Sequence, residues 1–331
     1  MRMRVNQDRC ERVTQMALAA ALLLIVSVVG MAQEPLPSVG LASAVKMPDV
    51  RDGAAVAAPD ATPDAGVVDK WATVFGAKIH YLEGGSGPVV ILLHGLGGSV
   101  SNWAPTIAPL AQKYRVIAPD QIGFGKSDKP MLNYRVGTLV DFLDGFYKQL
   151  GIQKASLVGN SLGGFTAAAF ALAHPDKVDK LVLVDAAGFT VTGDIDPRVL
   201  NGLNPSTRQQ VKDLIGLIFY NKEPFSSDAA VDGFLASRVM AGDGYTIQRF
   251  IDSIGHNEDM LDGKLGAIKQ PTLIIWGRED GLTQLAMGQR FNKEIAGSQI
   301  LIIEKCGHVP QLEKAAEFNA GLMKFLNGGG K

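Results

Sequence analysis

The stretch LVGNSLGGF, residues 157–165, places one serine between glycines directly after a short apolar run. A strand that turns sharply into a helix needs small residues two positions before and after the turn, because the two elements cross closely there. Gly159 and Gly163 meet this requirement around Ser161, and Gly164 lets the helix pack closer. The pattern therefore predicts a strand, a tight turn that presents Ser161, and a helix.

Short runs rich in Val, Ile and Leu alternate with helix-like segments from about residue 67 onward. The runs are PVVILLHG (88–95), YRVIAPD (114–120), ASLVGNS (155–161), DKLVLVDAAG (179–188), PTLIIWG (271–277) and SQILIIEKCG (298–307), after a hairpin around Gly76 and Ala77. Helices are expected at about 137–150, 162–174, 284–295 and 312–327. Near-continuous apolar runs are typical of strands buried on both faces of a parallel sheet. The sequence thus predicts an open α/β sheet with its ligand site beyond the carboxyl ends of the strands.

One interval, at about 190–265, contains no run of the buried-strand type. Its segments STRQQVKDLIGLIFYN and SDAAVDGFLASRVM are helical in pattern. We expect a helical insertion that caps the strand ends rather than a separate domain, because so short a piece is flanked by strands of one sheet. Six large side chains could line an apolar pocket under this cap or form its core: Phe189, Phe219, Tyr220, Phe225, Phe234 and Met240.

A serine hydroxyl is a nucleophile only when a base takes its proton and a third group orients that base. In this type of fold the partners follow in the order serine, acid, histidine. Asp280 lies in REDGLT after the run PTLIIWG, and His308 follows the last run. The remaining histidines fall in the first hairpin, after the first buried run, at a helix end and in the cap: His80, His94, His174 and His256. Only His308 has the position and chain order of a general base.

The acid has an alternative. Asp185 also follows a strand, one core strand earlier, and Glu279 adjoins Asp280. Asp280 is preferred because its loop places the carboxylate a few residues beyond the strand, whereas Asp185 is so close to its strand that it is expected to satisfy buried backbone donors.

A tetrahedral oxyanion needs preorganised N–H donors. The backbone N–H of Leu162, directly after the serine, is one candidate, and that of Leu96 in HGLGGS is the other. The pair His94-Gly95 in the same stretch is also compatible with a tight turn that the imidazole stabilises.

LLHGLGG, PDQIGFGKSD, GNSLGG, WGRED and CGH together resemble the α/β-hydrolase superfamily, over residues 67 to 328. The resemblance implies a mostly parallel eight-stranded sheet with helices on both faces, a helical cap, and a Ser161–His308–Asp280 triad. The serine indicates the serine-nucleophile branch. GNSLGG, SNW and KCGH look like the carbon–carbon bond hydrolases of meta-cleavage products, although Val309 stands where those enzymes usually carry tryptophan.

The N-terminus predicts export. Four arginines within residues 2–12 precede the uncharged run MALAAALLLIVSVVG, and Gly30 and Ala32 fit a cleavage before Gln33. The run has about 15 residues, fewer than the roughly 20 that span a bilayer. We expect a signal peptide at 1–32, a flexible Ala/Pro/Asp/Gly-rich linker at 33–66 and a hydrolase domain at 67–331, in a periplasmic or secreted protein. An uncleaved signal that anchors the chain is the alternative.

Composition excludes several classes of partner. The 331 residues carry a formal net charge of −1, which argues against a nucleic-acid partner. No CxxC or His/Cys cluster suggests a metal site. GFGKS resembles the end of a phosphate-binding loop, but Asp120 stands where its first glycine should be. We therefore expect a small-molecule substrate, no cofactor and no stable membrane insertion of the mature chain, with the oligomeric state left open.

These inferences favour a serine hydrolase that cleaves a small or medium apolar ester through an acyl-enzyme. A carbon–carbon bond hydrolase of vinylogous diketones, using the same residues, is the first alternative. A non-catalytic binding protein on the same fold is an alternative of another class.

Overall fold

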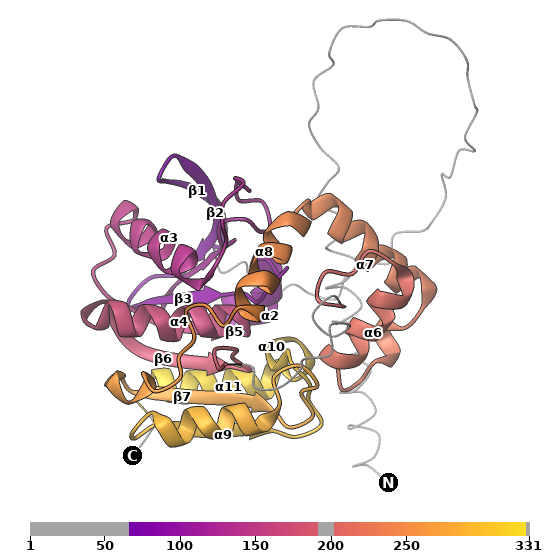
Figure 1. Ribbon diagram of the computed structural model, residues 1–331. Helices are drawn as coiled ribbons and strands as arrows, with labels where there is room; N and C mark the ends of the chain where they lie inside the picture. The colour runs from indigo at the N-terminus through magenta and orange to yellow at the C-terminus, as the bar shows by residue number, and fades with distance from the viewer. Residues whose placement is uncertain (1–65, 191–201, 329–331) are drawn as a thin grey trace, which may run out of the picture.

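The computed structural model describes residues 66–190 and 202–328 (Figure 1). The signal peptide expected at 1–32 and almost all of the linker expected at 33–66 lie outside these residues, as does the part of the expected cap at 191–201. Across the two described stretches, none of the helices has both the length and the apolar character that a bilayer crossing requires.

Eight strands form one sheet, in the order β1-β2-β4-β3-β5-β6-β7-β8. The strands are β1 (Val68–Val74), β2 (Ala77–Gly84), β3 (Val89–Leu93), β4 (Arg115–Pro119), β5 (Ala155–Asn160), β6 (Val178–Val184), β7 (Thr272–Gly277) and β8 (Gln299–Ile303). Strand β2 runs antiparallel to both of its neighbours, and every other pairing is parallel. The expected hairpin and all six apolar runs are confirmed as strands, in a mostly parallel eight-stranded sheet.

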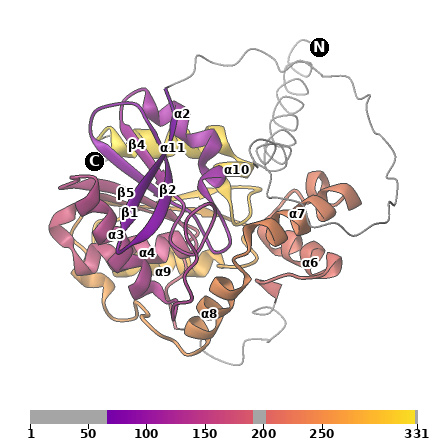
Figure 2. The same cartoon turned by 90° about the horizontal axis from the view of Figure 1, so that it is seen from above.

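Helices cover both faces of the sheet, because successive residues of a strand point to opposite sides. Ile91 and Leu93 of β3 belong to one buried cluster, and Val90 and Leu92 belong to the other. Helices α3 (Val136–Gln149), α4 (Leu162–Ala173) and α9 (Leu285–Glu294) pack in the first cluster, and α2 (Ala104–Ala111) and α11 (Ala315–Leu326) pack in the second. Figure 2 shows the two groups of helices on opposite sides of the strands.

The last expected helix, at 312–327, differs in the structure. It starts earlier, at Pro310, and is divided into α10 (Pro310–Glu313) and α11 by Lys314, whose φ of −132° and ψ of 44° are not helical. Proline suits the first position of a helix, which explains the start. The side chain of Glu313 is bound by backbone N–H groups outside the helix, which accompanies the break.

The part of the chain that the structure describes between β6 and β7, which we call the inserted segment, contains the helices α6 (Arg208–Ile218), α7 (Asp228–Ala241) and α8 (Gly244–Gly255). The hydroxyls of Thr207 and Ser227 cap α6 and α7, and Gly242, with φ 61°, ends α7. Figure 1 shows α6 and α7 beyond the carboxyl ends of the strands. Short 3₁₀ helices complete the described chain: η1 (Val100–Trp103), η2 (Pro175–Lys177), η3 (Glu223–Phe225) and η4 (Leu265–Ala267).

The helices of the inserted segment pack in two different hydrophobic clusters. Helix α8 joins the main core through Ile247, Phe250 and Ile251, whereas α6 and α7 share a small cluster of their own. Phe225 is 6% exposed in that small cluster, and its ring stacks on Phe219 with 3.9 Å between centroids.

Four of the six side chains weighed for a pocket are buried or pack against a core, which supports the core alternative for these four. Phe234 packs against the small cluster, and Phe189 is buried against Phe291 in the main core. Tyr220 and Met240 are exposed. Most of these six residues are therefore used in packing, and a pocket that any of them lines stays a prediction.

Candidate active site

Ser161 occupies the turn between β5 and α4. Its φ of 56° and ψ of −118° lie in a region that non-glycine residues rarely adopt, and such strain persists only where the surroundings impose it. The Ser161 N–H donates to Val184 O at 2.9 Å, and its carbonyl accepts from the N–H of Phe165 at 3.0 Å. The side chain is partly exposed, so a substrate could reach it.

The glycines around the serine are required by close backbone contacts. A Cβ at Gly159 would lie 2.1 Å from the carbonyl oxygen of Gly163, and a Cβ at Gly163 would lie 2.2 Å from that of Leu93. Neither clash could be relieved by turning a side chain, because the atoms met are backbone. The structure thus explains the glycine spacing from which the turn was predicted.

The loops after β7 and β8 bring Asp280 and His308 together. His308 Nδ1 lies 2.7 Å from Asp280 Oδ2, and the two residues are 5% and 6% exposed. Thr283 Oγ1 donates to the same carboxylate oxygen at 2.6 Å, while Asp280 Oδ1 accepts from the N–H groups of Leu282 and Thr283. Burial alone would raise the pKa of Asp280, but the charge and hydrogen bond of His308 and the Thr283 hydroxyl outweigh it and lower the pKa.

The loop that carries His308 is bound to the turn that carries Ser161. Asn160, the residue before the serine, donates from Nδ2 to His308 O at 3.0 Å and to Val184 O at 3.2 Å. One amide therefore connects the ends of β5 and β6 to the loop after β8, and it holds the backbone of His308 next to the serine turn.

Asp185, the alternative acid, lies beside the same pair. It is fully buried at the end of β6 with φ 43°, and its Oδ1 accepts from the N–H of Gly277 at 2.9 Å, as expected of a carboxylate that serves the backbone. Burial, followed by the negative charge of Asp280, raises the pKa of Asp185 well above its usual range. Two neighbouring carboxyls with opposite shifts take different roles. The ionised Asp280 is the one suited to orient an imidazolium.

The stretch that holds Leu96 forms a turn against the serine. The N–H of Gly98 donates to Gly95 O at 3.1 Å, and a Cβ at Gly95 would lie 3.1 Å from Ser161 Cβ. His94 Nδ1 donates to Gly95 O at 2.8 Å. The imidazole thus stabilises the turn, as the structural interpretation of His94-Gly95 predicted. Leu162 is the first residue of α4, directly after the serine.

One cation near this turn was missed by sequence reasoning. Arg238 of α7 donates from Nη1 to Gly97 O at 3.2 Å and forms an ion pair with the buried Asp243. The guanidinium is thereby placed beside the loop of Leu96. The only signal in the sequence is one arginine inside the apolar stretch FLASRVM, and such a residue is commonly a solvated surface charge.

The residues around GFGKS are organised by a protein carboxylate. Asp120, 1% exposed, accepts from the N–H groups of Val100 at 2.7 Å and Lys126 at 2.8 Å, and His80 Nδ1 lies 2.7 Å from it. A carboxylate thus takes the backbone donors that a phosphate would need in a phosphate-binding loop.

Within residues 66–190 and 202–328, one trio of side chains has metal-ligand atoms within 4.8 Å of one another: Asp185, Asp280 and His308. Within this trio, His308 Nδ1 and Asp280 Oδ2 are already joined to each other by a hydrogen bond.

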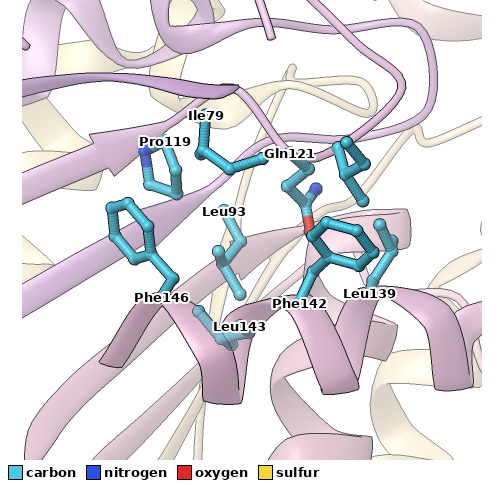
Figure 3. Close-up of a pocket in the computed structure, with 9 residues that line it drawn as sticks. Ile79, Leu93, Pro119, Gln121, Leu139, Phe142, Leu143 and Phe146 are labelled. Carbon is cyan, nitrogen blue, oxygen red and sulfur yellow. The ribbon is translucent and has the colours of Figure 1, made fainter. Parts of the chain in front are cut away.

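A narrow apolar cavity lies between α3 and the sheet (Figure 3). Leu139, Phe142, Leu143 and Phe146 of α3 face Ile79, Leu93, Pro119 and Gln121 across it. The amide of Gln121 donates to His94 O at 2.8 Å, so this polar group serves the backbone. A ligand site needs polar groups that converge on the ligand, and we assign this cavity to packing.

The amino-acid sequence is similar to those of known proteins. The family described as alpha/beta hydrolase fold matches residues 88–315. A 2-hydroxy-6-oxononadienedioate/2-hydroxy-6-oxononatrienedioate hydrolase of Cupriavidus pinatubonensis is 34% identical over 269 residues, which cover 75% of this chain and 90% of the relative.

Two solved structures are similar throughout most of their length. A meta-cleavage product hydrolase from Pseudomonas fluorescens IP01 has a TM-score of 0.72 at 30% identity, covering 78% of this chain and 98% of that one. A bacterial membrane phospholipase A has a TM-score of 0.72 at 29% identity, covering 80% and 87%. With a matching family, relatives named hydrolases and the eight-stranded sheet in place, this chain belongs to the alpha/beta hydrolase family and is a hydrolase.

Proposed function

We propose that Ser161, His308 and Asp280 form the catalytic triad of this hydrolase. Ser161 attacks a substrate carbonyl, His308 Nε2 takes the serine proton, and Asp280 holds the imidazole with its proton on Nδ1. The N–H groups of Leu96 and Leu162 stabilise the oxyanion, and water then releases the acyl group. The hydrogen-bonded pair of His308 and Asp280, bound through Asn160 to the serine turn, is the observation that carries this proposal.

The substrate class that we propose is a 2-hydroxy-6-oxo-dienoate, which is cleaved at a carbon–carbon bond. The sequence placed ester cleavage first, but the relatives compared above favour the alternative, because two of them are named for meta-cleavage products or for such dienoates. Attack of the serine on the carbonyl at position six forms a tetrahedral oxyanion. When this intermediate collapses, the bond between carbons five and six breaks and its electron pair passes to carbon five. In the keto form of the substrate, conjugation carries that charge to the oxygen at position two, so the carbon can leave.

Arg238 supports this class of substrate. A dienoate carries a carboxylate, whereas a simple ester does not, and a guanidinium recognises carboxylates with several N–H donors in a fixed plane. Arg238 lies beside Gly97, next to the proposed oxyanion donor Leu96, and is only partly used by Gly97 O and Asp243. We expect the acid end of the substrate to face this arginine.

Ester hydrolysis is the second candidate, and two observations favour it. The chain is similar in structure to a membrane phospholipase A, and Val309 follows the histidine where carbon–carbon hydrolases usually have tryptophan. The same triad would serve an ester, without the need for a conjugated leaving group.

The test compares kcat/KM for a 2-hydroxy-6-oxo-dienoate with kcat/KM for p-nitrophenyl esters of increasing chain length. We expect the dienoate to be preferred and both activities to vanish in Ser161→Ala and in His308→Ala while the melting temperature is kept, because the triad acts as a unit. Turnover of the esters with an inert dienoate would favour the ester reading. If neither is cleaved, and a fluorophosphonate fails to label Ser161, a binding protein on this fold becomes the better account.

A further inference from the structure

The end of α6 is bound to both loops that carry the proposed acid and base. Leu217 O accepts from the N–H of Gly281 at 3.2 Å, and Ile218 O accepts from the N–H of His308 at 2.7 Å. These are backbone contacts between the inserted segment and residues next to Asp280 or within His308 itself. The inserted segment therefore contributes to where the His308 backbone lies.

A buried carboxylate reinforces the same contact from the other side. Glu313, 9% exposed, accepts at Oε1 from the N–H of Gly307 at 2.8 Å. At Oε2 it accepts from the N–H groups of Tyr220 at 2.9 Å and Asn221 at 3.3 Å. One oxygen thus binds the His308 loop and the other binds the chain that follows α6.

The backbone at the end of α6 approaches the loops of Gly281 and Gly307 so closely that glycine is needed at both positions. A Cβ at Gly307 would lie 2.2 Å from Ile218 O and 2.9 Å from the nitrogen of Tyr220. A Cβ at Gly281 would lie 2.9 Å from Leu217 O. The contact is therefore built into the backbone of both loops rather than made by side chains that could turn away.

The chemistry of this contact suits a carboxylate. An ionised carboxylate accepts at both oxygens, so it can satisfy N–H donors that converge from two directions. A glutamine of the same shape would have to turn its NH₂ group toward one set of donors. A buried charge is tolerated where hydrogen bonds compensate for lost water, and three backbone donors do so here.

We propose that Glu313 is a positioning residue that ties the end of α6 to the His308 loop, so that the placement of the base depends on the docked inserted segment. The proposal rests on the role of His308 as the base. It assigns to the inserted segment a part in the chemistry, besides any contact with substrate.

The test uses Glu313→Gln in the full chain, with Glu317→Gln on the exposed side of α11 as the matched control. Amide hydrogen exchange is followed in the segments 218–222 and 304–309, together with the rate at which a small fluorophosphonate labels Ser161. We expect faster exchange in both segments, and a fall in labelling rate and kcat of about 10- to 100-fold, the range that a misplacement near 1 Å can cause. KM should change much less than kcat, and the control should match the wild type.

A second variant approaches the contact from the inserted segment. Tyr220→Pro removes one N–H donor and leaves Glu313 intact, and the extended conformation of Phe219, with φ −106° and ψ 136°, suits a residue before proline. We expect the rate of Ser161 labelling to fall in Tyr220→Pro as it does in Glu313→Gln. This variant therefore tests the contact even where Glu313→Gln folds poorly.

The proposal would be overturned by unchanged exchange in both segments or by faster exchange in only one of them. It would also be overturned by normal labelling and kcat when exchange is faster in both segments. The exchange readout does not depend on turnover. A failure of the proposed function would instead appear as undiminished labelling in His308→Ala.

Discussion

His308 Nδ1 lies 2.7 Å from Asp280 Oδ2, in a contact that is almost wholly buried. The Thr283 hydroxyl donates to the same carboxylate oxygen. An imidazole that donates a hydrogen bond from Nδ1–H to a carboxylate keeps the lone pair of Nε2 free to accept a proton, which is the state that a general base requires. The relationship between these two residues is the basis for the first prediction.

Asp280→Asn should lower kcat by about 10⁴-fold, because an amide permits the wrong imidazole tautomer. Asp185→Asn should retain most of the activity, since an amide oxygen can still accept from the N–H of Gly277. Steady-state kinetics of the two variants, with circular dichroism to establish folding, checks the assignment. Near wild-type activity in Asp280→Asn together with an inactive Asp185→Asn would show that the acid is Asp185.

Asp185 should also make stability depend on pH. Burial and the charge of Asp280 raise the folded-state pKa of Asp185, so the folded protein binds this proton more tightly than the unfolded chain does. The free energy of unfolding then falls as the pH rises above the ordinary pKa of an aspartate, about 3.9, until the folded pKa is passed. Asp185→Asn removes this loss. We expect its melting temperature, relative to that of the wild type, to increase from pH 4 to pH 8; a constant difference would contradict the raised pKa.

Arg238→Gln should discriminate between substrates. If Arg238 binds the carboxylate of a dienoate, kcat/KM for the dienoate should fall by about 10- to 100-fold, as expected when a charge-assisted hydrogen bond of about 1.5–3 kcal/mol is lost. A neutral p-nitrophenyl ester should be affected much less. Arg249→Gln, which removes an arginine paired with Asp252 on α8, is the control. Equal losses for the dienoate and the ester would mean that Arg238 acts only through the fold.

Phe225→Ala should destabilise the protein without changing substrate preference. Phe225 is buried in the small core of α6 and α7, and phenylalanine-to-alanine changes in cores cost about 3–5 kcal/mol. Thermal melting, measured beside kcat/KM for short and long esters, separates a core role from a pocket role. Met240→Ala, at an exposed position of α7, serves as the control. A shifted chain-length preference at an unchanged melting temperature would restore the pocket interpretation for Phe225.

Export is predicted from residues outside the described structure. The arginines, the apolar run and the small residues Gly30 and Ala32 predict a mature chain that begins near Gln33. N-terminal sequencing of protein from the native cell envelope measures this directly. An intact Met1 recovered in the membrane fraction would support the uncleaved anchor.

The strands and the candidate triad could be predicted because their signals are local. Each buried strand is a near-continuous apolar run. The serine turn requires glycines at fixed spacing, since a Cβ at Gly159 would meet the backbone of Gly163 and a Cβ at Gly163 would meet the backbone of Leu93. Asp280 and His308 follow strands of one parallel sheet, whose carboxyl ends share an edge. Chain order was therefore enough to nominate them.

Other features could be identified only from the tertiary structure. Arg238 contacts Gly97 across 141 positions of the chain, and Glu313 contacts Tyr220 across 93. Neither partner carries a local pattern that names the other. Likewise, an aromatic side chain at helical spacing fits a core or a pocket equally well until its neighbours are known, as for Phe225. The sheet, the serine turn and the order of the candidate triad follow from local patterns in the chain, because periodicity and backbone sterics act over a few residues. The docking of the inserted segment on the His308 loop has no such local pattern, because those backbone groups are distant in the chain and meet only when the molecule is packed.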